Sequence, residues 1–455
     1  NSGHIAVAST ASAADFELGG DVTLNGGGTV TFSGPIATVN AIGDFTLTNL
    51  DNTLHGTGNI GANLARIANQ GHVEARTGEL LRIDPRSGGA GIATFDNQNV
   101  VQALGGGTIE LSGNAGGEFG GSGTYIAQDG SEVVLITNAI ARNTTFDSAG
   151  TGIVRTGASD NIELHDVTNN GNLQISNNSD LRMHGTITNA GTIAVASTGN
   201  NARFELGSSI LLTGGGTVDL SGPAASVTAI GDFALINSTN TLQGEGTIGG
   251  NTARVVNQAT IDANVDGATL RLDPRTGGAG VVTFDNEAIA QASGGGTLEL
   301  SGNAGGEFGG SGIYRAMAGS QVALANGAIA RNTTFDTVGD GLVRIPDNQN
   351  IEFHDVINAG ALEVGNNTDL RVHGSLTNNG TITLASTGGN SDFELGADVT
   401  LAGIGALNFS GPAARIDTIS PAFPLTNDDG HAITGAGQIH AHIINFGTIT
   451  AQSPT

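Results

Sequence analysis

The chain has 455 residues, no cysteine, sixteen basic residues that are all arginine, and a formal net charge of −26. The absence of cysteine excludes disulfide bonds and thiolate metal sites, and the negative charge excludes a surface that neutralises nucleic-acid phosphates. Aromatic residues make up only 4% and glycine contributes 74 residues, so the apolar side chains must form a narrow core. Such a core is typical of a solenoid, in which each coil packs only on its neighbours.

Short strands separated by tight turns are predicted from the first coil onward. Apolar and polar residues alternate in Thr29–Phe32, in Thr192–Val195 and in Thr381–Leu384, and a period of two predicts half-buried strands. Ser-Gly-Pro follows the first of them at 33–35, and Asn-x-Gly turns recur along the chain. No segment keeps a helical period, and no apolar run reaches the about 18 residues that a membrane-spanning helix needs.

A long internal repeat divides the chain. Leu111–Gly123 returns unchanged as Leu300–Gly312, so the repeat is about 189 residues long. This predicts copies at 1–188 and 189–377 and a partial copy at 378–455, joined in one continuous solenoid.

A shorter period lies within the long one. The pattern apolar-x-Asn-x-Gly-x-apolar occurs at Val167–Leu173 and again at Ile187–Ile193, and neighbouring examples lie about 19–21 residues apart. We therefore expect an all-β parallel solenoid with about 19–21 residues per coil, about nine coils per repeat and about 22 in all. At about 4.8 Å per coil this gives a rod on the order of 100 Å long. An array of antiparallel β-sandwiches is the alternative, and the short period fits it poorly.

The Gly-Thr-Ile and Gly-Thr-Leu segments with their Asn-x-Gly turns resemble filamentous-haemagglutinin-like proteins and autotransporter passenger domains. The resemblance covers most of the chain. It implies a right-handed parallel β-helix on a bacterial surface, acting in adhesion, aggregation or biofilm-matrix formation. The long repeat is more regular than in a typical passenger domain.

Histidine and glutamate residues form two candidate metal columns. In Ile162–His165 the alternation turns Glu163 and His165 outward, and Leu181–His184 repeats the arrangement nineteen residues later. If Arg203–Leu206 follows in the next coil, two imidazoles and one carboxylate stack in each copy and could hold a divalent cation such as Zn²⁺. The candidate residues are His165, His184 and Glu205 in the first copy and His354, His373 and Glu394 in the second. The alternative is a solvated column of imidazoles and ion pairs. No other cofactor is indicated.

Outward carboxylates suggest a second, enzymatic interpretation. Glu110 and Asp147, with Glu299 and Asp336 in the next copy, could serve a polysaccharide-cleaving β-helix. However, such a site would occur twice, lysine is absent, and sugar-stacking aromatic residues are scarce. The interpretation favoured is therefore not an enzyme. The phenylalanines at 95/284, 119/308 and 146/335 are expected inside the coil, and turn asparagines are expected to stack as amide ladders.

These observations favour an extracellular or cell-surface structural protein that forms a rigid rod or filament. Neither end carries an obvious polar cap, which predicts a piece of a longer protein or head-to-tail self-association. An adhesin that binds host or matrix glycan is the alternative, with the irregular segment 413–434 as its expected site. A tailspike-like polysaccharide-degrading enzyme is the third candidate.

Overall fold

The computed structural model describes residues 1–452, which form 53 strands and no helix. The strands stack in parallel as a β-solenoid of about 19 turns with about 23 residues per turn, which confirms the predicted fold class. The chain divides into two compact units, Asn1–Ala225 and Ser226–Thr455, and each is described by itself. The described part of the chain contains no helix that is long and apolar enough to cross a membrane.

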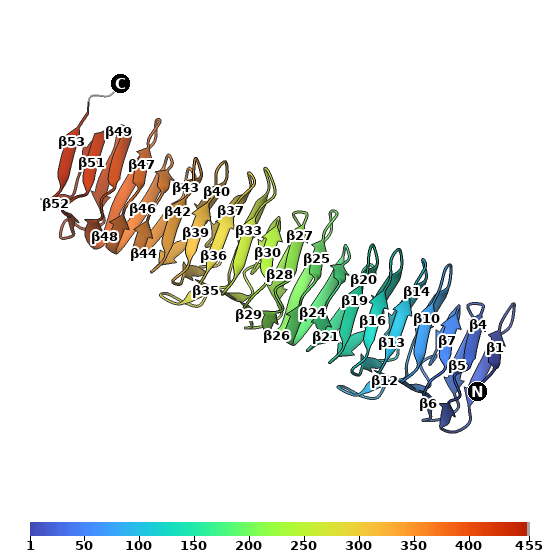
Figure 1. Ribbon diagram of the computed structural model, residues 1–455. Helices are drawn as coiled ribbons and strands as arrows, with labels where there is room; N and C mark the ends of the chain where they lie inside the picture. The colour runs from blue at the N-terminus through green and yellow to red at the C-terminus, as the bar shows by residue number, and fades with distance from the viewer. Residues whose placement is uncertain (453–455) are drawn as a thin grey trace. The chain divides into compact units, whose positions relative to one another are not determined.

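Each turn of unit 1 carries three strands, which stack on the strands of the next turn in three columns (Figure 1). The first column holds β1 (His4–Ala8), β4 (Thr29–Ser33), β7 (Thr53–Gly56), β10 (His72–Ala75), β13 (Val100–Ala103), β16 (Thr124–Ala127), β19 (Thr145–Ser148) and β22 (Thr168–Asn169). The second holds β2 (Ala14–Leu18), β5 (Ala37–Ala41), β8 (Gly58–Ile60), β11 (Leu80–Ile83), β14 (Thr108–Ser112), β17 (Glu132–Ile136), β20 (Ile153–Thr156), β23 (Asn172–Ile175), β25 (Thr192–Ala196) and β27 (Thr217–Ser221). The third holds β3 (Val22–Leu24), β6 (Thr46–Asn49), β9 (Arg66–Asn69), β12 (Ala93–Asn97), β15 (Glu118–Gly120), β18 (Ile140–Arg142) and β21 (Asn161–His165). Two long strands, β24 (Ser179–Asn189) and β26 (Ala202–Thr213), bend at a corner and extend both the third and the first columns.

Unit 2 has the same arrangement. One column holds β28 (Ala225–Ala229), β31 (Gly246–Ile248), β34 (Thr269–Leu272), β37 (Thr297–Ser301), β40 (Gln321–Ala325), β43 (Leu342–Ile345), β45 (Ala361–Val364), β47 (Thr381–Ala385) and β53 (Thr448–Ala451). A second begins with β29 (Ala234–Asn237), β32 (Arg254–Asn257), β35 (Val282–Asn286), β38 (Glu307–Gly309) and β41 (Ile329–Arg331). A third holds β30 (Thr241–Gly244), β33 (Thr260–Ala263), β36 (Ile289–Ala292), β39 (Ile313–Ala316), β42 (Thr334–Thr337), β50 (Pro424–Asn427) and β52 (His442–Asn445). The long strands β44 (Asn350–Asn358), β46 (Thr368–Asn378), β48 (Ser391–Ala402), β49 (Ala406–Thr418) and β51 (Ala432–Ile439) each contribute to two columns.

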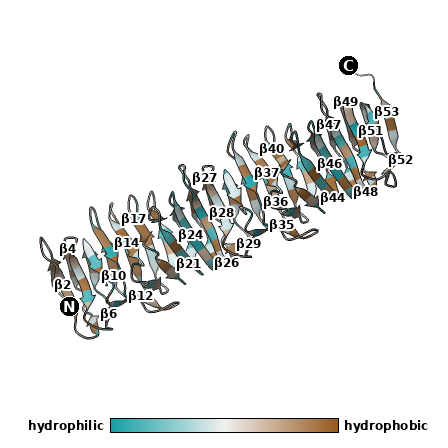
Figure 2. Ribbon diagram, turned by 180° about the vertical axis from the view of Figure 1, so that it is seen from behind, coloured by the Kyte–Doolittle hydropathy of each residue, from teal (hydrophilic) through white to brown (hydrophobic). Residues whose placement is uncertain are grey.

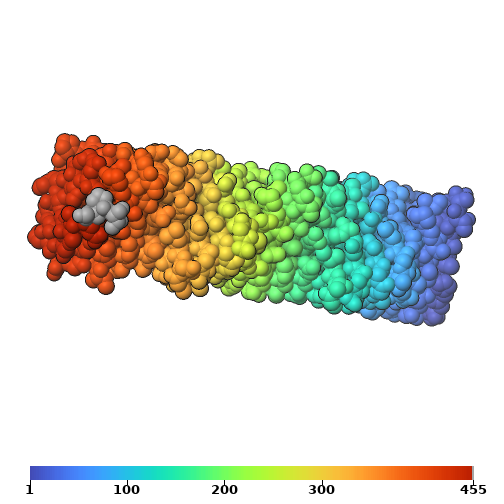
Figure 3. Space-filling view, turned by 90° about the horizontal axis from the view of Figure 1, so that it is seen from above, coloured from blue at the N-terminus to red at the C-terminus, as the bar shows by residue number. Residues whose placement is uncertain are grey.

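Alternating side chains seal the core of each unit. In β6, Leu47 is fully buried whereas Thr46 and Thr48 face outward, and Leu47 stacks on Ile67 of the next turn. Figure 2 shows hydrophobic and hydrophilic residues mixed along the strands, as this alternation requires. In each unit the residues follow one another in sequence order in the space-filling view (Figure 3). Each turn therefore packs on its predecessor and its successor.

Aromatic residues fill the interior where the predicted phenylalanines lie. Phe95, Phe119 and Phe146 and their second-copy equivalents are all fully buried. The ring centroids of Phe95 and Phe119 are 5.9 Å apart, and those of Phe284 and Phe308 are 5.7 Å apart. The expectation of inward phenylalanines is confirmed.

Buried asparagines stack as the predicted amide ladders. Asn49 Nδ2 donates to Asn69 Oδ1 over 2.9 Å, and Asn69 Nδ2 donates to Asn97 Oδ1 over 2.9 Å. Asn237, Asn257 and Asn286 repeat the ladder in unit 2, with 2.9 Å for each bond. These amides satisfy the turn backbone inside the protein, where water cannot reach it.

Turn length varies more than the Asn-x-Gly spacing suggested. Successive ladder asparagines are 20 residues apart at Asn49 and Asn69 but 28 apart at Asn69 and Asn97. The extra residues bulge out at a corner as the loop that precedes β12, so the strand columns stay in register. The predicted 19–21 residues per coil matched only the shortest turns, and the mean of about 23 lowers the number of turns to about 19.

The long repeat does not contain a whole number of turns. Ile-Ala-Val-Ala-Ser-Thr at 5–10 recurs at 193–198, so β25 is the sequence equivalent of β1. Yet β25 extends the second column of unit 1, which starts with β2, and not the first. In unit 2, residues 415–418 are the equivalents of 226–229 and also lie one column further on. Each repeat therefore advances the equivalent segments by one of the three faces.

Candidate metal centre and surface groove

The outer side of the third column in unit 1 brings two histidines together. Parallel pairing of β18, β21 and β24 places Arg142, His165 and His184 one above another. The two imidazole rings are parallel within 3°, and their centroids are 4.1 Å apart. The stacking that the sequence predicted for these histidines is therefore present.

The carboxylate beside the histidines is Glu163 and not the predicted Glu205. Glu163 Oε2 lies 3.5 Å from His165 Nε2 and 3.9 Å from His184 Nε2. Glu205 pairs in register with Arg182, twenty-three residues earlier, and accepts a 2.8 Å hydrogen bond from Arg182 Nε. The prediction assumed a shorter coil, which shifted the register by two residues and moved Glu205 into the histidine column.

The second copy has the same geometry in unit 2. His354 and His373 stack with their centroids 4.3 Å apart and their planes within 1°. Glu352 Oε2 lies 3.4 Å from His354 Nε2 and 3.8 Å from His373 Nε2. The predicted Glu394 is again held by an arginine, through a 2.7 Å hydrogen bond from Arg371 Nε.

Glycine occupies the next position of each histidine column. A Cβ atom on Gly207 would lie 2.3 Å from Cε1 and 2.4 Å from Nε2 of His184, and one on Gly396 would lie 2.3 Å from Cε1 of His373. Any larger residue would displace the imidazole. A glutamate in that position, as the sequence interpretation required, would force the stacked imidazole to move.

Burial favours the neutral form of all four histidines. Desolvation, followed by the neighbouring His184 and Arg142, lowers the pKa of His165. Desolvation is also the largest cause of the lowered pKa of His184, His354 and His373. Neutral imidazole is the form that ligates metal ions, so at pH 7 these side chains are ready to act as ligands.

Three of the four carboxylates of the enzymatic interpretation lie in ion pairs between turns. Arg82 holds Glu110 at 2.7 Å, Arg271 holds Glu299 at 2.8 Å, and Arg315 holds Asp336 at 2.9 Å. Asp147 accepts a 2.8 Å hydrogen bond from the backbone amide of Ser148.

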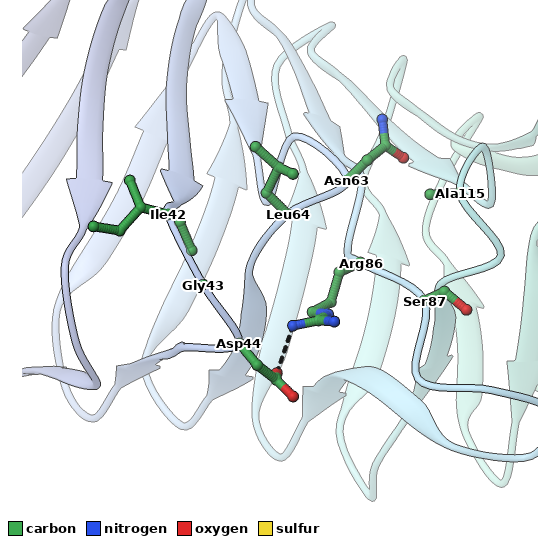
Figure 4. A pocket seen from close by; sticks show the side chains of 9 residues that line it. Ile42, Gly43, Asp44, Asn63, Leu64, Arg86, Ser87 and Ala115 are labelled. Carbon is green, nitrogen blue, oxygen red and sulfur yellow. Dashed lines mark ion pairs between the residues drawn. The ribbon is translucent and has the colours of Figure 1, made fainter.

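A groove of about 430 Å³ lies at a corner of unit 1, between the loops that follow β5, β8, β11 and β14 (Figure 4). Asp44 binds Arg66 and Arg86, both over 2.7 Å, and Arg66 holds the pKa of Asp44 below its usual range. Ile42 and Leu64 beside them are 68% and 50% exposed. The groove combines ion-paired side chains with exposed apolar side chains, and the sequence did not predict it as a site.

Two further buried groups were also missed from the sequence. Glu118 and Glu307 are almost fully buried and bind Arg142 and Arg331, which adjoin the histidine columns. His431 is fully buried, and burial lowers its pKa to about 4. The sequence did not indicate that these groups are buried, and only the structure reveals their partners.

Comparison with known proteins gives no match to any protein-family model, to any curated protein sequence or to any solved structure. The β-solenoid itself is consistent with the predicted likeness to surface β-helix proteins, but no family match confirms filamentous-haemagglutinin-like or autotransporter identity.

Proposed function

We propose that the chain is an extracellular structural protein whose solenoid acts as a rigid scaffold, with no enzymatic role. The observation that carries the proposal is the unbroken parallel pairing of successive turns within each unit, around a core whose inner side chains are almost completely buried. Hydrogen bonds run between turns at every strand. Bending a unit would therefore break backbone hydrogen bonds and core contacts at the same time. This resistance to bending suits a rigid structural element better than a catalytic domain that opens and closes on a hinge.

The distribution of charge supports the same function. Arginines bridge carboxylates of successive turns, as Arg182 does with Glu163 over 2.9 Å and with Glu205 over 2.8 Å. The remaining excess of acid, a net charge of −26, keeps the surfaces of separate molecules apart. A scaffold that stays soluble outside the cell until it assembles would have this charge.

The advance of the repeat by one face argues against a single flat binding side. Equivalent segments in each unit fall on different columns, so they do not build one continuous row of identical side chains. An adhesin that binds many identical sites on a surface with one of its sides would gain affinity from such a row. A scaffold does not need one.

Head-to-tail assembly is part of the proposal. Ile433 is 1% exposed beneath β53, whereas its register partner Ile449 is 43% exposed and nearby Phe446 is 65% exposed. Any turn added at this edge, from the same chain or from a second copy, would bury these side chains, and we propose that a second copy can supply it.

Cryo-electron microscopy of the chain over a range of concentrations tests the scaffold. We expect straight rods with an axial repeat of about 4.8 Å that lengthen into filaments as the concentration rises. Flexible particles with no such repeat would refute the rigid scaffold. Rods of constant length at all concentrations would refute only the assembly step. Immunogold labelling of intact source cells tests the extracellular location, and label confined to the cell interior would contradict it.

The groove at Asp44 favours an adhesin as the second candidate function. Arg86 can donate hydrogen bonds to sugar hydroxyl or carboxylate groups, Asp44 can accept them from sugar hydroxyl groups, and Leu64 offers an apolar wall. A glycan array compares the chain with its Arg86→Ala variant. Binding that the variant loses would favour the adhesin, whereas no binding by either protein would remove it.

A further inference from the structure

Two Glu–His–His clusters, one in each unit, stand apart from any scaffold role. We propose that each cluster binds one divalent transition-metal ion, Zn²⁺ or Cu²⁺, through two imidazole nitrogens and one carboxylate oxygen. The cluster residues are Glu163, His165 and His184 in unit 1 and Glu352, His354 and His373 in unit 2.

The ligand atoms already lie close to the required positions. In each cluster one donor atom from every residue lies within 4.8 Å of the other two. Zinc binds imidazole nitrogen at about 2.0–2.1 Å, so two nitrogens on one ion are at most about 4.2 Å apart. The two stacked rings must therefore tilt toward each other for both nitrogens to reach one ion.

Three of the four histidine Nε2 atoms lack a hydrogen-bond partner among the described residues, and the fourth, in His354, contacts Glu352 Oε2 over 3.4 Å. The three are those of His165, His184 and His373, and each of these atoms is buried. The contacts of these nitrogens with glutamate, at 3.5–3.9 Å, are longer than a normal hydrogen bond. Buried polar atoms are nearly always satisfied in proteins, and a metal ion would satisfy these nitrogens together with the free oxygen of the carboxylate.

Arginine orients the glutamate without occupying its free oxygen. Arg182 binds Glu163 Oε1, which leaves Oε2 directed at the histidines, and Arg371 binds Glu352 in the same way. Such partners fix the orientation of metal ligands in known sites. The nearest other cation, Arg142, is paired with the buried Glu118 at 2.6 Å, which offsets its repulsion of an incoming ion.

The donor set selects the class of ion. Two imidazoles and one carboxylate suit Zn²⁺, Cu²⁺ or Ni²⁺, whereas Ca²⁺ and Mg²⁺ require more oxygen ligands. Three protein ligands leave room for water on the ion. Glycine at 207 and 396 keeps space beside the second imidazole of each cluster, in both copies.

Titration calorimetry of the whole chain with ZnCl₂ at pH 7.5 tests the stoichiometry. We expect two ions per chain, one after either His184→Gln or His373→Gln, and none after both changes. The exposed His72 serves as the matched control, and His72→Gln should still bind two ions. Circular dichroism verifies that each variant is folded. Absence of saturable binding, or two ions bound by the double variant, would overturn the proposal.

A second comparison identifies the carboxylate. Glu163→Gln in the His373→Gln background should weaken Zn²⁺ binding at least tenfold, whereas Glu205→Gln in the same background should change it less than threefold. The opposite order would assign the ligand to Glu205 and refute the geometry. Electron paramagnetic resonance of the Cu²⁺-loaded chain should show coupling to two imidazole nitrogens per ion. Coupling to none would reduce the clusters to stacked histidines.

Discussion

The amide ladder of unit 2 allows a sharp test of what holds the turns together. Asn257 is fully buried, and its Nδ2 donates to Asn286 Oδ1 over 2.9 Å and to the backbone oxygens of Ala259 and Ile289, both over 3.1 Å. Its Oδ1 accepts a 2.9 Å hydrogen bond from Asn237. Asn257→Ala therefore removes four hydrogen-bonding contacts, three of which share the two hydrogens of Nδ2, and leaves buried polar atoms without partners.

The expected loss follows from these contacts. At about 1 kcal/mol for each net hydrogen bond, with more for a buried atom left unpaired, Asn257→Ala should lower the free energy of unfolding by about 3–5 kcal/mol. The exposed Asn264 provides a matched control, and Asn264→Ala should change stability by less than about 0.5 kcal/mol. Urea unfolding followed by circular dichroism measures both values.

Hydrogen exchange locates the damage. Because turns contact only their neighbours, amides of residues 232–292 should exchange at least about 100-fold faster in Asn257→Ala, while those of residues 29–83 should not change. A loss below about 1 kcal/mol, or equal acceleration in both segments, would refute the view that the ladder stabilises turns locally.

Three other perturbations have defined outcomes. The pKa of His431 is about 4 in the folded protein and about 6.5 in the unfolded chain, so the unfolded chain binds a proton at higher pH. The free energy of unfolding should therefore fall by up to about 3 kcal/mol as the pH drops from 6.5 to 4. Urea titrations of His431→Gln should show a weaker dependence of this free energy on pH. Phe308→Ala should cost about 3–5 kcal/mol in the same assay, and Phe308→Leu clearly less, because the ring is fully buried against Phe284. Gly121→Ala should lower the melting temperature well below that of Gly130→Ala, since both glycines have positive φ but only Gly121 would place a Cβ 2.1 Å from a backbone oxygen.

Alternation along the strands made the fold predictable. Leu, Ile and Val at every second position, with Thr between them, define which side of a strand is buried, and short polar turns exclude helical connections. Turn length was not predictable to the same degree, because extra residues at a corner leave the alternation on both sides intact. The 28-residue step from Asn69 to Asn97 is an example.

The candidate metal site shows how one such error spreads. The nineteen-residue step from His165 to His184 was assigned correctly, and the two rings stack. The following step is 23 residues, from Arg182 to Glu205. The prediction used a step two residues shorter, which placed Glu205 above His184 and not above Arg182. The residue two positions before a histidine shares its outward face, so Glu163 could have been ranked above Glu205 from the alternation alone.

The advance of each repeat by one face has a consequence for avidity. In an array of such repeats, equivalent side chains would lie on successive faces of the solenoid and would return to the same face only after three repeats. A flat partner that carries many copies of one receptor would then engage every third repeat at most, with a correspondingly long gap between its contacts. A small, freely diffusing partner would instead meet the same determinant from any direction of approach.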